Sequence, residues 1–363
     1  MNTLEQTEEQ DPRLAKFISI LKLAKQEGAS DIHLAPRSPI MLRIDGSLVP
    51  ISGMTIEPFE IEGMLETMLN EGQRAHLEEM GELDYAYSIA GFNRLRINVF
   101  RQRGTYAMAL RILSFEIPDP KKLGIPQSVI NTSDLKRGLV LVTGATGSGK
   151  STTLAALISL IAQKYQKNII TLEDPIEYLH KHGKSIVLQR EVGFDTQSYA
   201  NALRAALRQD PDVILVGEMR DLETISTAIT AAETGHLVFS TLHTNSTSAS
   251  IDRMIDVFPP HQQQQIRIQL ATVLECIVAQ QLLPEENGGR VAAFEVMLCN
   301  MAIRNLIREG KSFQIPSTIQ TSRNEGMQTM DDSILEHYMK GKISKQTALN
   351  FALDRVALEK RIF

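Results

Sequence analysis

Apolar and polar positions follow two different patterns along the chain. In the first part, apolar residues spaced for one helix face predict helices over residues 13–25 and 58–80. Apolar and polar residues also alternate there, which predicts short antiparallel strands over residues 32–34, 40–44, 48–50, 84–89, 92–100 and 105–112. Asp45-Gly46, Gly91 and Gly104 stand at the expected turns. We therefore expect a small α+β domain over residues 1–115, with helices on one side of its sheet.

In the second part, apolar runs of strand length alternate with helix-like segments. The expected strands are residues 139–143, 168–173, 213–217, 237–241 and 291–296. This alternation predicts a doubly wound α/β domain over residues 136–300. Three prolines within residues 114–126 place a linker at 116–135. Residues 301–363 are expected to form a helical region, with Gly310 and Gly341 as breaks.

Composition narrows the class of protein. The chain has 363 residues, of which 43% are hydrophobic, so we expect two or three packed domains. The net charge of −5 and pI near 6.0 give no overall attraction to nucleic acid or anionic lipid. Cys276 and Cys299 are the only cysteines, which excludes a four-cysteine zinc site and favours a reducing cytoplasm. No apolar run approaches the ~20 residues that cross a bilayer, and the acidic start is unlike a signal peptide, so we expect membrane association only through a partner.

The segment from Gly144 to Ser151 matches the pattern G-x-x-x-x-G-K-[ST] at every position. A strand-like run precedes it and a helix-like run follows it, which disfavours an ordinary glycine-rich helix cap and predicts a phosphate loop. Its glycines would let backbone N–H groups surround phosphate oxygens, Lys150 would neutralise charge toward the β/γ end, and Ser151 would offer its hydroxyl to Mg²⁺. The expected binding residues are Gly144, Thr146, Gly147, Ser148, Gly149, Lys150, Ser151 and Thr152.

Acidic residues end two of the expected strands. Glu218 follows four apolar residues and Gly217, which places it at the edge where open α/β sheets bind ligands. There it could hold the water shell of Mg²⁺ or polarise the attacking water. The alternative role, as the cap of the following helix, is better filled by Asp221. Glu173 and Glu177 form a second cluster, in which either acid could accept a proton from water. The spacing does not choose between these two.

Histidines and arginines supply further candidates. His236 and His243 bracket the expected strand at 237–241, on opposite faces or at opposite ends of it, so one could sense the γ-phosphate while the other contacts a neighbouring subunit. Five arginines lie on or between strands of the first domain, where most belong to a solvated sheet face. In a ring, one or two could act on a neighbour's γ-phosphate. They are Arg94, Arg96, Arg101, Arg103 and Arg111, of which Arg96 and Arg111 are our catalytic candidates.

With these segments in order, the chain resembles the secretion ATPase superfamily that drives type II secretion and type IV pili, and most closely its retraction ATPases. The resemblance identifies residues 144–151 with the Walker A loop, 169–180 with the Asp box, 210–221 with the Walker B segment and 234–244 with the His box. Ala145 departs from the proline common in relatives. The family implies a PAS-like N-terminal domain, a RecA-like ATPase domain and a homo-hexameric ring, with nucleotide between the two domains and neighbouring subunits.

The same resemblance implies a function. The implied protein is an ATP-hydrolysing, Mg²⁺-dependent motor in the cytoplasm, peripheral at the inner face of the cytoplasmic membrane. Such a motor acts on an inner-membrane platform protein and takes a paralogous retraction or assembly ATPase as a further partner, with no nucleic acid and no direct membrane insertion. Residues 302–309 resemble a motif of retraction ATPases, and Arg304 within it is expected to matter more for retraction than for hydrolysis. The missing four-cysteine site and the short N-terminal region also favour retraction over assembly.

Two other functions stay open at this point. A RecA-like nucleic-acid motor would need a basic groove with stacking aromatics, whereas aromatic residues are 5% of this chain and tryptophan is absent. An accessory subunit that does not hydrolyse ATP would not need the acids at positions 173, 177 and 218, so their presence argues against it.

Overall fold

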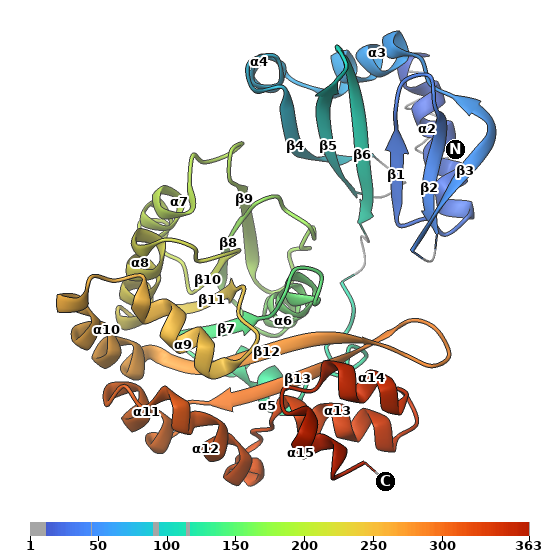
Figure 1. Cartoon of the computed structure of the whole chain (residues 1–363). Helices are drawn as coiled ribbons and strands as arrows, with labels where there is room; N and C mark the ends of the chain where they lie inside the picture. The colour runs from blue at the N-terminus through green and yellow to red at the C-terminus, as the bar shows by residue number, and fades with distance from the viewer. Residues whose placement is uncertain (1–11, 45, 90–93, 114–116, 363) are drawn as a thin grey trace. The chain divides into compact units, whose positions relative to one another are not determined.

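The chain forms two compact units. The computed structural model describes residues 12–44, 46–89, 94–113 and 117–362. The first unit comprises Met1–Glu116 with Pro175–Leu179, and the second comprises Ile117–Asp174 with His180–Phe363 (Figure 1). The acidic start, the turn residues Asp45 and Gly91, the beginning of the strand expected at 92–100 and the start of the linker lie outside the described residues.

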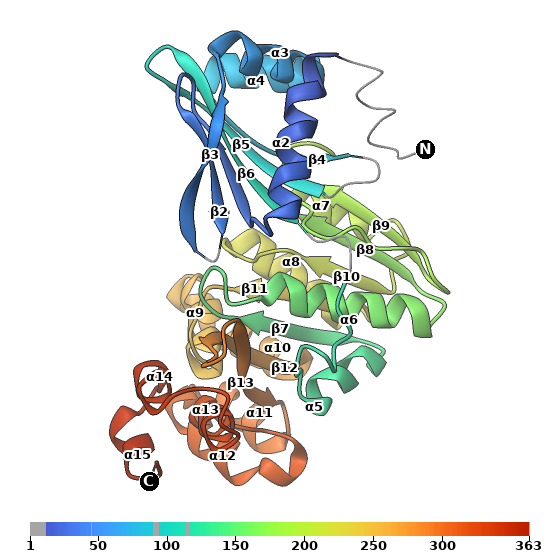
Figure 2. The same ribbon diagram turned by 90° about the vertical axis from the view of Figure 1, so that its right-hand side faces the viewer.

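The first unit is built on an antiparallel sheet. Within the described residues its six strands are ordered β3-β2-β1-β6-β5-β4, with every neighbouring pair antiparallel (Figure 1). Figure 2 shows the same sheet turned by 90°. The elements are η1 (Pro12–Leu14), α2 (Ala15–Gln26), β1 (Asp31–Leu34), β2 (Pro39–Ile44), β3 (Ser47–Thr55), α3 (Pro58–Met68), α4 (Glu71–Met80), β4 (Glu82–Ser88), β5 (Arg94–Gln102) and β6 (Thr105–Leu113). The α+β organisation expected from the sequence is confirmed.

A single apolar core joins the helices of this unit to one face of the sheet. On β5, Leu95, Ile97 and Val99 are buried in that core, whereas Arg94 and Arg96 alternate with them and are partly exposed. The two arginines therefore share the open face, as their spacing predicts.

The segment expected to be helical, residues 58–80, is helical and consists of two helices, α3 and α4. Asn70 begins the second one: its side chain accepts a hydrogen bond from the Gln73 N–H at 2.9 Å, and the Gln73 side chain accepts one from the Asn70 N–H at 3.1 Å. This reciprocal capping stabilises a new helix start within the helical segment.

The second unit is built on a mostly parallel sheet. Its strands, within the described residues, are ordered β13-β12-β7-β11-β10-β8-β9, and only the β12–β13 pair is antiparallel. The elements are α5 (Gln127–Ile130), η2 (Asn131–Asp134), β7 (Gly138–Thr143), α6 (Lys150–Lys164), β8 (Asn168–Glu173), β9 (Ile186–Glu191), α7 (Tyr199–Ala206), β10 (Val213–Val216), α8 (Leu222–Glu233), β11 (Leu237–Leu242), α9 (Thr247–Asp256), α10 (Pro260–Val273), β12 (Leu274–Pro284) and β13 (Arg290–Leu298).

Helices cover both faces of this sheet. One core packs α5 and α6 against it, and another packs α7 to α10 against the opposite face. Because both faces are covered, the strands are apolar along their whole length: β7, β10 and β11 are buried at every position. The expected doubly wound sheet is thereby confirmed. Residues 127–134, which the sequence places in a linker, form α5 and η2, and Val129 and Ile130 enter the α6 core.

Two strands of the second unit were not expected from the sequence. Strand β12 begins at Leu274, directly after α10 ends at Val273, with no glycine or proline between them to mark the change. Strand β9 lies at the sheet edge, where Ile186 and Leu188 are exposed and Val187 between them is buried. Apolar residues therefore occupy both faces of this strand, and the alternation of apolar and polar residues that predicts a half-buried strand is missing.

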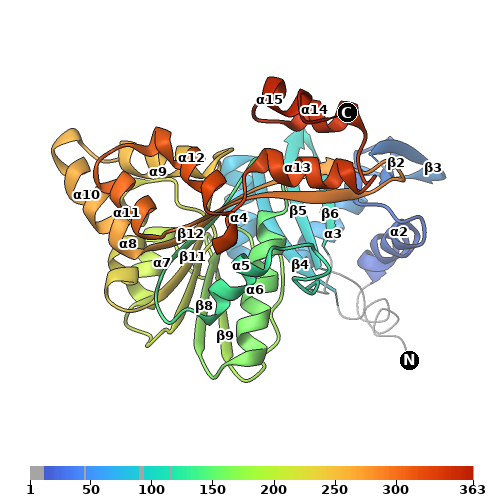
Figure 3. The same cartoon turned by 90° about the horizontal axis from the view of Figure 1, so that it is seen from below.

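The C-terminal region is helical, as expected. It contains α11 (Met301–Arg308), η3 (Ser312–Gln314), α12 (Ile315–Thr321), η4 (Arg323–Glu325), α13 (Met330–Met339), α14 (Lys345–Phe351) and α15 (Arg355–Glu359). Helices α13 to α15 pack on Ala279, Leu283 and Ala293 of the β12–β13 hairpin and form a separate small core there (Figure 3). None of the helices in the described ranges combines the length and apolarity that crossing a membrane requires.

Candidate nucleotide site at the strand edge

The phosphate loop connects β7 to α6, as the sequence predicts. Gly144 follows the strand, and Gly149 precedes the first helical residue, Lys150. Both glycines have positive φ, 145° and 89°, a backbone conformation that side chains disfavour. A Cβ at Gly144 would lie 2.4 Å from the Gln280 carbonyl oxygen, and one at Gly149 would lie 2.7 Å from Gln280 Nε2. The backbone of β12 thus leaves room only for glycine at Gly144, whereas at Gly149 the neighbour is the flexible end of the Gln280 side chain and the positive φ is what favours glycine.

Two polar groups of the loop are suited to an anion. Lys150 is 8% exposed, and its Nζ donates hydrogen bonds to the carbonyl oxygens of Gly144 and Ala145, both at 2.9 Å. The Ser148 hydroxyl is buried and has no hydrogen-bond partner among the described residues. Burying an unpaired hydroxyl is costly, and a phosphate oxygen would accept its hydrogen bond. The loop therefore has the donor set that a bound phosphate requires.

Four segments that carry predicted site residues meet at one edge of the sheet. Strands β7, β11, β10 and β8 are parallel neighbours, and Thr143 lies beside Leu242 and Val216 beside Leu172. The residues that follow the strands therefore emerge at a common edge, where open α/β sheets bind ligands. Four predicted site residues lie there: Gly144, Glu173, Glu218 and His243.

Glu218 is held by two basic side chains. Its Oε1 lies 2.7 Å from Arg220 Nε and 3.3 Å from His243 Nε2, and the carboxylate side chain is 16% exposed. Burial raises the pKa of Glu218, but the hydrogen bond from Arg220 and the charges of Arg220 and His243 outweigh it, so the pKa lies below its ordinary value. Glu218 is therefore a carboxylate at neutral pH and a weak base. The expected helix cap is Asp221, whose side chain accepts from the Thr224 N–H at 2.8 Å, and this leaves Glu218 available to the site.

The backbone around Glu218 is fixed by both neighbouring strands. The Gly217 N–H donates to the Leu172 carbonyl at 2.7 Å, and the Thr241 hydroxyl donates to the Gly217 carbonyl at 2.5 Å. A Cβ at Gly217 would lie 2.8 Å from the Tyr199 hydroxyl. Burial, and then the charges of Asp174, Glu218 and Glu173, raise the pKa of Tyr199. A neutral phenol therefore lies beside the acids of this edge.

Side chains link the residue after His243 to the residue before the phosphate loop. The neighbour of His243, Thr244, contacts the Ser250 hydroxyl at 2.6 Å, and Ser250 lies 3.5 Å from Thr143, the residue before the loop. Ser250 is buried on α9. His236, in contrast, lies before β11 at the opposite end of the strand, where its Nδ1 is 2.9 Å from the Ala231 carbonyl. The structure thus brings His243, and not His236, to the edge that bears the loop.

The two acids of the second cluster belong to different units. Glu173 ends β8 in the second unit and accepts hydrogen bonds from Thr171 at 2.6 Å and Gln189 at 3.1 Å. Glu177 belongs to the first unit, where its Oε1 lies 3.9 Å from Arg96 Nη1. Beyond them in the chain, burial lowers the pKa of His180 to about 4, so this histidine is neutral.

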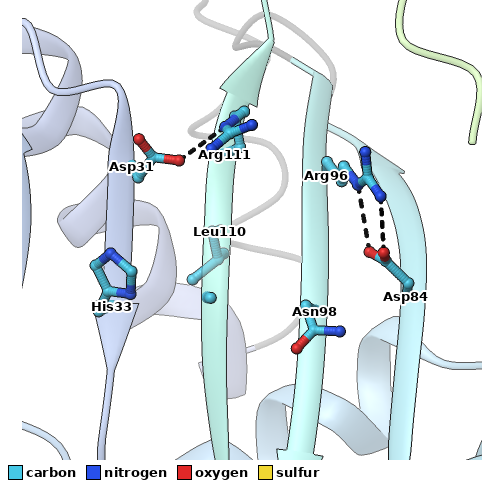
Figure 4. A pocket seen from close by; sticks show the side chains of 8 residues that line it. Asp31, His33, Asp84, Arg96, Asn98, Leu110 and Arg111 are labelled. Carbon is cyan, nitrogen blue, oxygen red and sulfur yellow. Dashed lines mark hydrogen bonds and ion pairs between the residues drawn. The ribbon is translucent and has the colours of Figure 1, made fainter. Parts of the chain in front are cut away.

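The two candidate arginines lie on the open face of the first unit's sheet (Figure 4). Arg96 on β5 pairs with Asp84 on β4 at 2.9 Å, and Arg111 on β6 pairs with Asp31 on β1 at 2.8 Å. Together with His33 and Asn98, these residues line a hollow of about 210 Å³. Arg111 is the more exposed, at 63%. Each guanidinium thus has a carboxylate partner on a neighbouring strand.

The motif at residues 302–309 forms most of α11, and Arg304 points into the unit. Its Nη1 donates to the carbonyl oxygens of Ala271 at 2.7 Å and Thr272 at 3.0 Å, and its Nη2 lies 3.0 Å from Glu275 Oε1. These carbonyls are at the C-terminal end of α10, where a cation is favourable. Arg304 therefore fastens α10 to α11.

Three residues near the site carry no prediction from the sequence. They are Gln280, which contacts the loop and accepts a hydrogen bond from Thr153 at 2.8 Å, Arg220, which binds Glu218, and Tyr199. Arg220 follows Glu218 by two residues, so the sequence could have predicted that it pairs with Glu218. Gln280 and Tyr199 come from distant segments and give no local signal.

The residues present fit a magnesium ion carried by phosphate. The described part of the chain holds no cluster of three or more His, Cys, Asp or Glu side chains that could bind a metal alone. Mg²⁺ at nucleotide sites uses few protein ligands and several phosphate or water oxygens. Ser151, in the first turn of α6, and the carboxylate of Glu218 supply oxygens of this kind.

Comparison with known proteins identifies the family. The model of the type II/IV secretion system protein family matches residues 6–350. The type IV pilus retractation ATPase PilT of Pseudomonas aeruginosa is 45% identical over 91% of this chain and 96% of the relative. The type IV pilus ATPase PilU of the same organism is 38% identical over 93% of this chain and 88% of the relative.

A solved structure agrees with this relationship. The crystal structure of the pilus retraction motor PilT with bound ADP has a TM-score of 0.88 and 50% identity, covering 94% of this chain and 98% of that one. The phosphate loop is a nucleotide-binding loop in this context. The chain belongs to the type II/IV secretion system protein family, and it is an ATPase of that family.

Proposed function

We propose that this protein is the ATP-hydrolysing motor of type IV pilus retraction, the process that produces twitching motility. The observation that carries the proposal is the meeting of the phosphate loop, Glu218 and His243 at one strand edge, in a chain that resembles pilus retraction ATPases over nearly its whole length. A loop of this kind binds ATP, and the acid and histidine beside it supply groups for hydrolysis.

Each side chain at the edge has a role in this proposal. Lys150 leaves the carbonyls of Gly144 and Ala145 and neutralises the β- and γ-phosphates, and the Ser148 hydroxyl gains a phosphate acceptor. Glu218 orients the attacking water, a role that suits a carboxylate with a lowered pKa better than removal of its proton. His243, in contact with Glu218, responds to the γ-phosphate.

Mg²⁺ is the second component of the proposed site. Ser151 would hold it, with Glu218 acting through water, and the ion would neutralise charge on the phosphates. Glu173 and Glu177 are the candidates for accepting the proton, and Arg96 and Arg111 are the candidates for acting on a neighbour's nucleotide.

The proposed assembly is a homo-hexamer in the cytoplasm at the inner face of the cytoplasmic membrane. It acts on an inner-membrane platform protein, and a paralogous ATPase is a further partner. The relatives named for pilus retraction and for a second pilus ATPase support this setting, because both align with more than nine-tenths of the chain. Nucleotide-dependent closure within such a ring would supply the mechanical step.

Gene deletion tests the direction of the motor. A strain without this gene is expected to carry excess pili and to lose twitching motility, because pili are assembled and not withdrawn. The chain with Glu218→Gln should fail to restore motility, whereas the wild-type gene should restore it. A deletion strain without pili would indicate a motor of assembly, and a strain with normal pili and motility would reject both roles.

A further inference from the structure

A buried acid of the second unit lies outside the groups described so far. Glu295 of β13 is 6% exposed. Its Oε1 accepts two hydrogen bonds from Thr247, the first residue of α9: one from the backbone N–H at 2.7 Å and one from the hydroxyl at 2.8 Å. Within the described residues Glu295 takes part in no ion pair. The donors at the start of α9 are therefore the partners that make burial of this acid favourable.

The strand register places Glu295 in the same row of the sheet as the start of the phosphate loop. Thr143, the residue before the loop, pairs with Ala279 of β12, and Ala279 pairs with Glu295 of β13. Side chains of one row project from the same face of a sheet. Helix α9 crosses this row, because Ser250 lies 3.5 Å from Thr143 and Thr247 binds Glu295. The helix is thus attached to the sheet at two points three residues apart.

A short connection joins the start of α9 to His243. Residues 243–246 link β11 to α9, and His243 is the first of them. On the strand side, pairing with β7 and β10 fixes β11. On the helix side, the Thr244 hydroxyl lies 2.6 Å from that of Ser250. A shift of α9 would pass through so short a connection to His243, whose Nε2 lies 3.3 Å from Glu218 Oε1.

Strand β13 is held on both sides of Glu295 by the C-terminal region. The Phe294 N–H donates to the Ser333 hydroxyl of α13 at 3.1 Å, and the Val296 N–H donates to the Gln328 carbonyl at 2.8 Å. The Gln328 side chain donates to the Phe294 carbonyl at 2.9 Å. Glu295 therefore joins the start of α9 to a part of the unit whose backbone is fixed.

We propose that Glu295 is a positioning residue for ATP hydrolysis. It holds the start of α9 on the sheet, and α9 in turn holds His243 against Glu218. The inference rests on the proposed role of His243 and adds a residue of β13 that acts through it. Because the hydrogen bonds of Glu295 go to α9 and not to the phosphate loop, its loss should affect turnover and not nucleotide binding.

Steady-state kinetics and calorimetry separate turnover from binding. We expect Glu295→Ala to lower kcat about tenfold, since a misplaced group slows the reaction, and to leave the KM for ATP and the Kd for ADP within about twofold of wild type. Glu295→Gln keeps an oxygen that accepts from Thr247, so it should retain more than about one third of the wild-type kcat. A wild-type kcat in Glu295→Ala would overturn the proposal, as would an ADP affinity that falls as much as kcat.

A double-mutant cycle shows whether Glu295 acts through His243. His243→Ala alone should lower kcat, and adding Glu295→Ala should change the remaining rate by less than about twofold, because the side chain that Glu295 positions is already gone. A further loss as large as that in the wild-type background would overturn the proposal and leave the role of His243 intact. A wild-type rate in His243→Ala would overturn that role, and the role of Glu295 with it.

A second capping residue is the control for a loss of stability alone. Asn300 accepts from the Ile303 N–H at 3.0 Å and caps α11. Asn300→Ala should therefore lower the melting temperature and keep kcat within about twofold at temperatures where the protein is folded. An equal fall of kcat in Asn300→Ala and Glu295→Ala would reduce Glu295 to a structural role and overturn the proposal.

Thr247 carries the test if circular dichroism shows that Glu295→Ala does not fold. Thr247→Val loses the hydrogen bond of the hydroxyl at nearly the same volume, so we expect kcat to fall about fivefold at unchanged KM. Thr247→Ser keeps the hydroxyl and should keep the wild-type kcat. Equal kcat values in these two variants would overturn the proposal.

Discussion

The two sheets of this protein use charged residues in opposite ways. In the first unit, charges spread across an open sheet face, and two arginines on it pair with acids from neighbouring strands, Arg96 with Asp84 and Arg111 with Asp31. In the second unit both faces are covered by helices, and the charges gather where the parallel strands end. There Glu218 contacts two basic side chains at once, Arg220 and His243.

This difference follows from the way each sheet is covered. On a sheet face that is open to solvent, water screens the ion pairs, and such pairs contribute only about 0–1 kcal/mol to stability. At the edge of a covered sheet, backbone hydrogen bonds to two neighbouring strands fix Gly217 next to Glu218, so the carboxylate is held with little freedom. Substitutions at the edge should therefore change catalysis, and those on the face should change little unless a neighbouring subunit uses it.

Lys150→Ala should have the largest effect. The buried ammonium is the only side-chain cation that the structure places within the loop, so we expect ATP turnover to fall at least about 10³-fold, with weaker ATP binding. Steady-state ATPase assays and calorimetry measure both quantities. Lys164→Ala at the other end of α6 removes a surface lysine that pairs with Asp134, and it should retain wild-type rates. A Lys150→Ala protein with normal turnover would reject the site.

Glu218→Gln should separate binding from turnover. The amide keeps the shape of the side chain and loses the charge, so we expect the rate to fall by about 10²- to 10³-fold while ATP affinity changes little. The neighbouring acid Asp221 gives a control, because Asp221→Asn still caps α8 and should keep the rate within about twofold. Equal rates for the two variants would show that position 218 has no special role.

Local signals account for what the sequence could predict. The phosphate loop is contiguous, and Glu218 and His243 each follow a strand that its own apolar run reveals. The spacing of His236 and His243 left their roles open, and only the register of β11 beside β7 showed which one lies at the loop. Gln280 could not be found, because it comes from β12, a strand that begins without a break after a helix. Contacts between distant segments carry no mark in the sequence.

Arg96→Ala tests whether the open face acts on a neighbour. If its guanidinium reaches a neighbour's γ-phosphate, turnover should fall more than about tenfold at unchanged nucleotide affinity. The same substitution should lower the free energy of unfolding by less than about 1 kcal/mol, since Arg96 is 35% exposed. Mixing Arg96→Ala with Lys150→Ala subunits should partly restore activity if the arginine acts between subunits. Turnover that stays at the wild-type rate would leave Arg96 with its ion pairs to Asp84 and Glu177 and no role in hydrolysis.

Arg220→Ala should move the pH dependence of turnover. Burial raises the pKa of Glu218, and Arg220 more than offsets this, so the wild-type carboxylate stays charged as pH falls to its ordinary pKa of 4.5. Without Arg220 the effect of burial is less opposed, the pKa of Glu218 rises, and the acid limb of the rate profile should shift to higher pH. Glu218→Gln should lack this limb. An unshifted limb in Arg220→Ala would mean that another group controls it.

Asp84→Asn and Asp31→Asn should have the smallest effects. Each removes the acid of an ion pair on the open face, where water screens the charges, so we expect the free energy of unfolding to fall by less than about 1 kcal/mol and ATP turnover to stay within about twofold. Denaturant unfolding and ATPase assays measure the two quantities. Because the Asp31 side chain is 15% exposed and the Asp84 side chain is 43% exposed, Asp31→Asn should lower the free energy of unfolding more than Asp84→Asn. A loss of turnover in Asp84→Asn as large as that in Arg96→Ala would show that the pair acts as one unit, and the contrast between face and edge would then not hold.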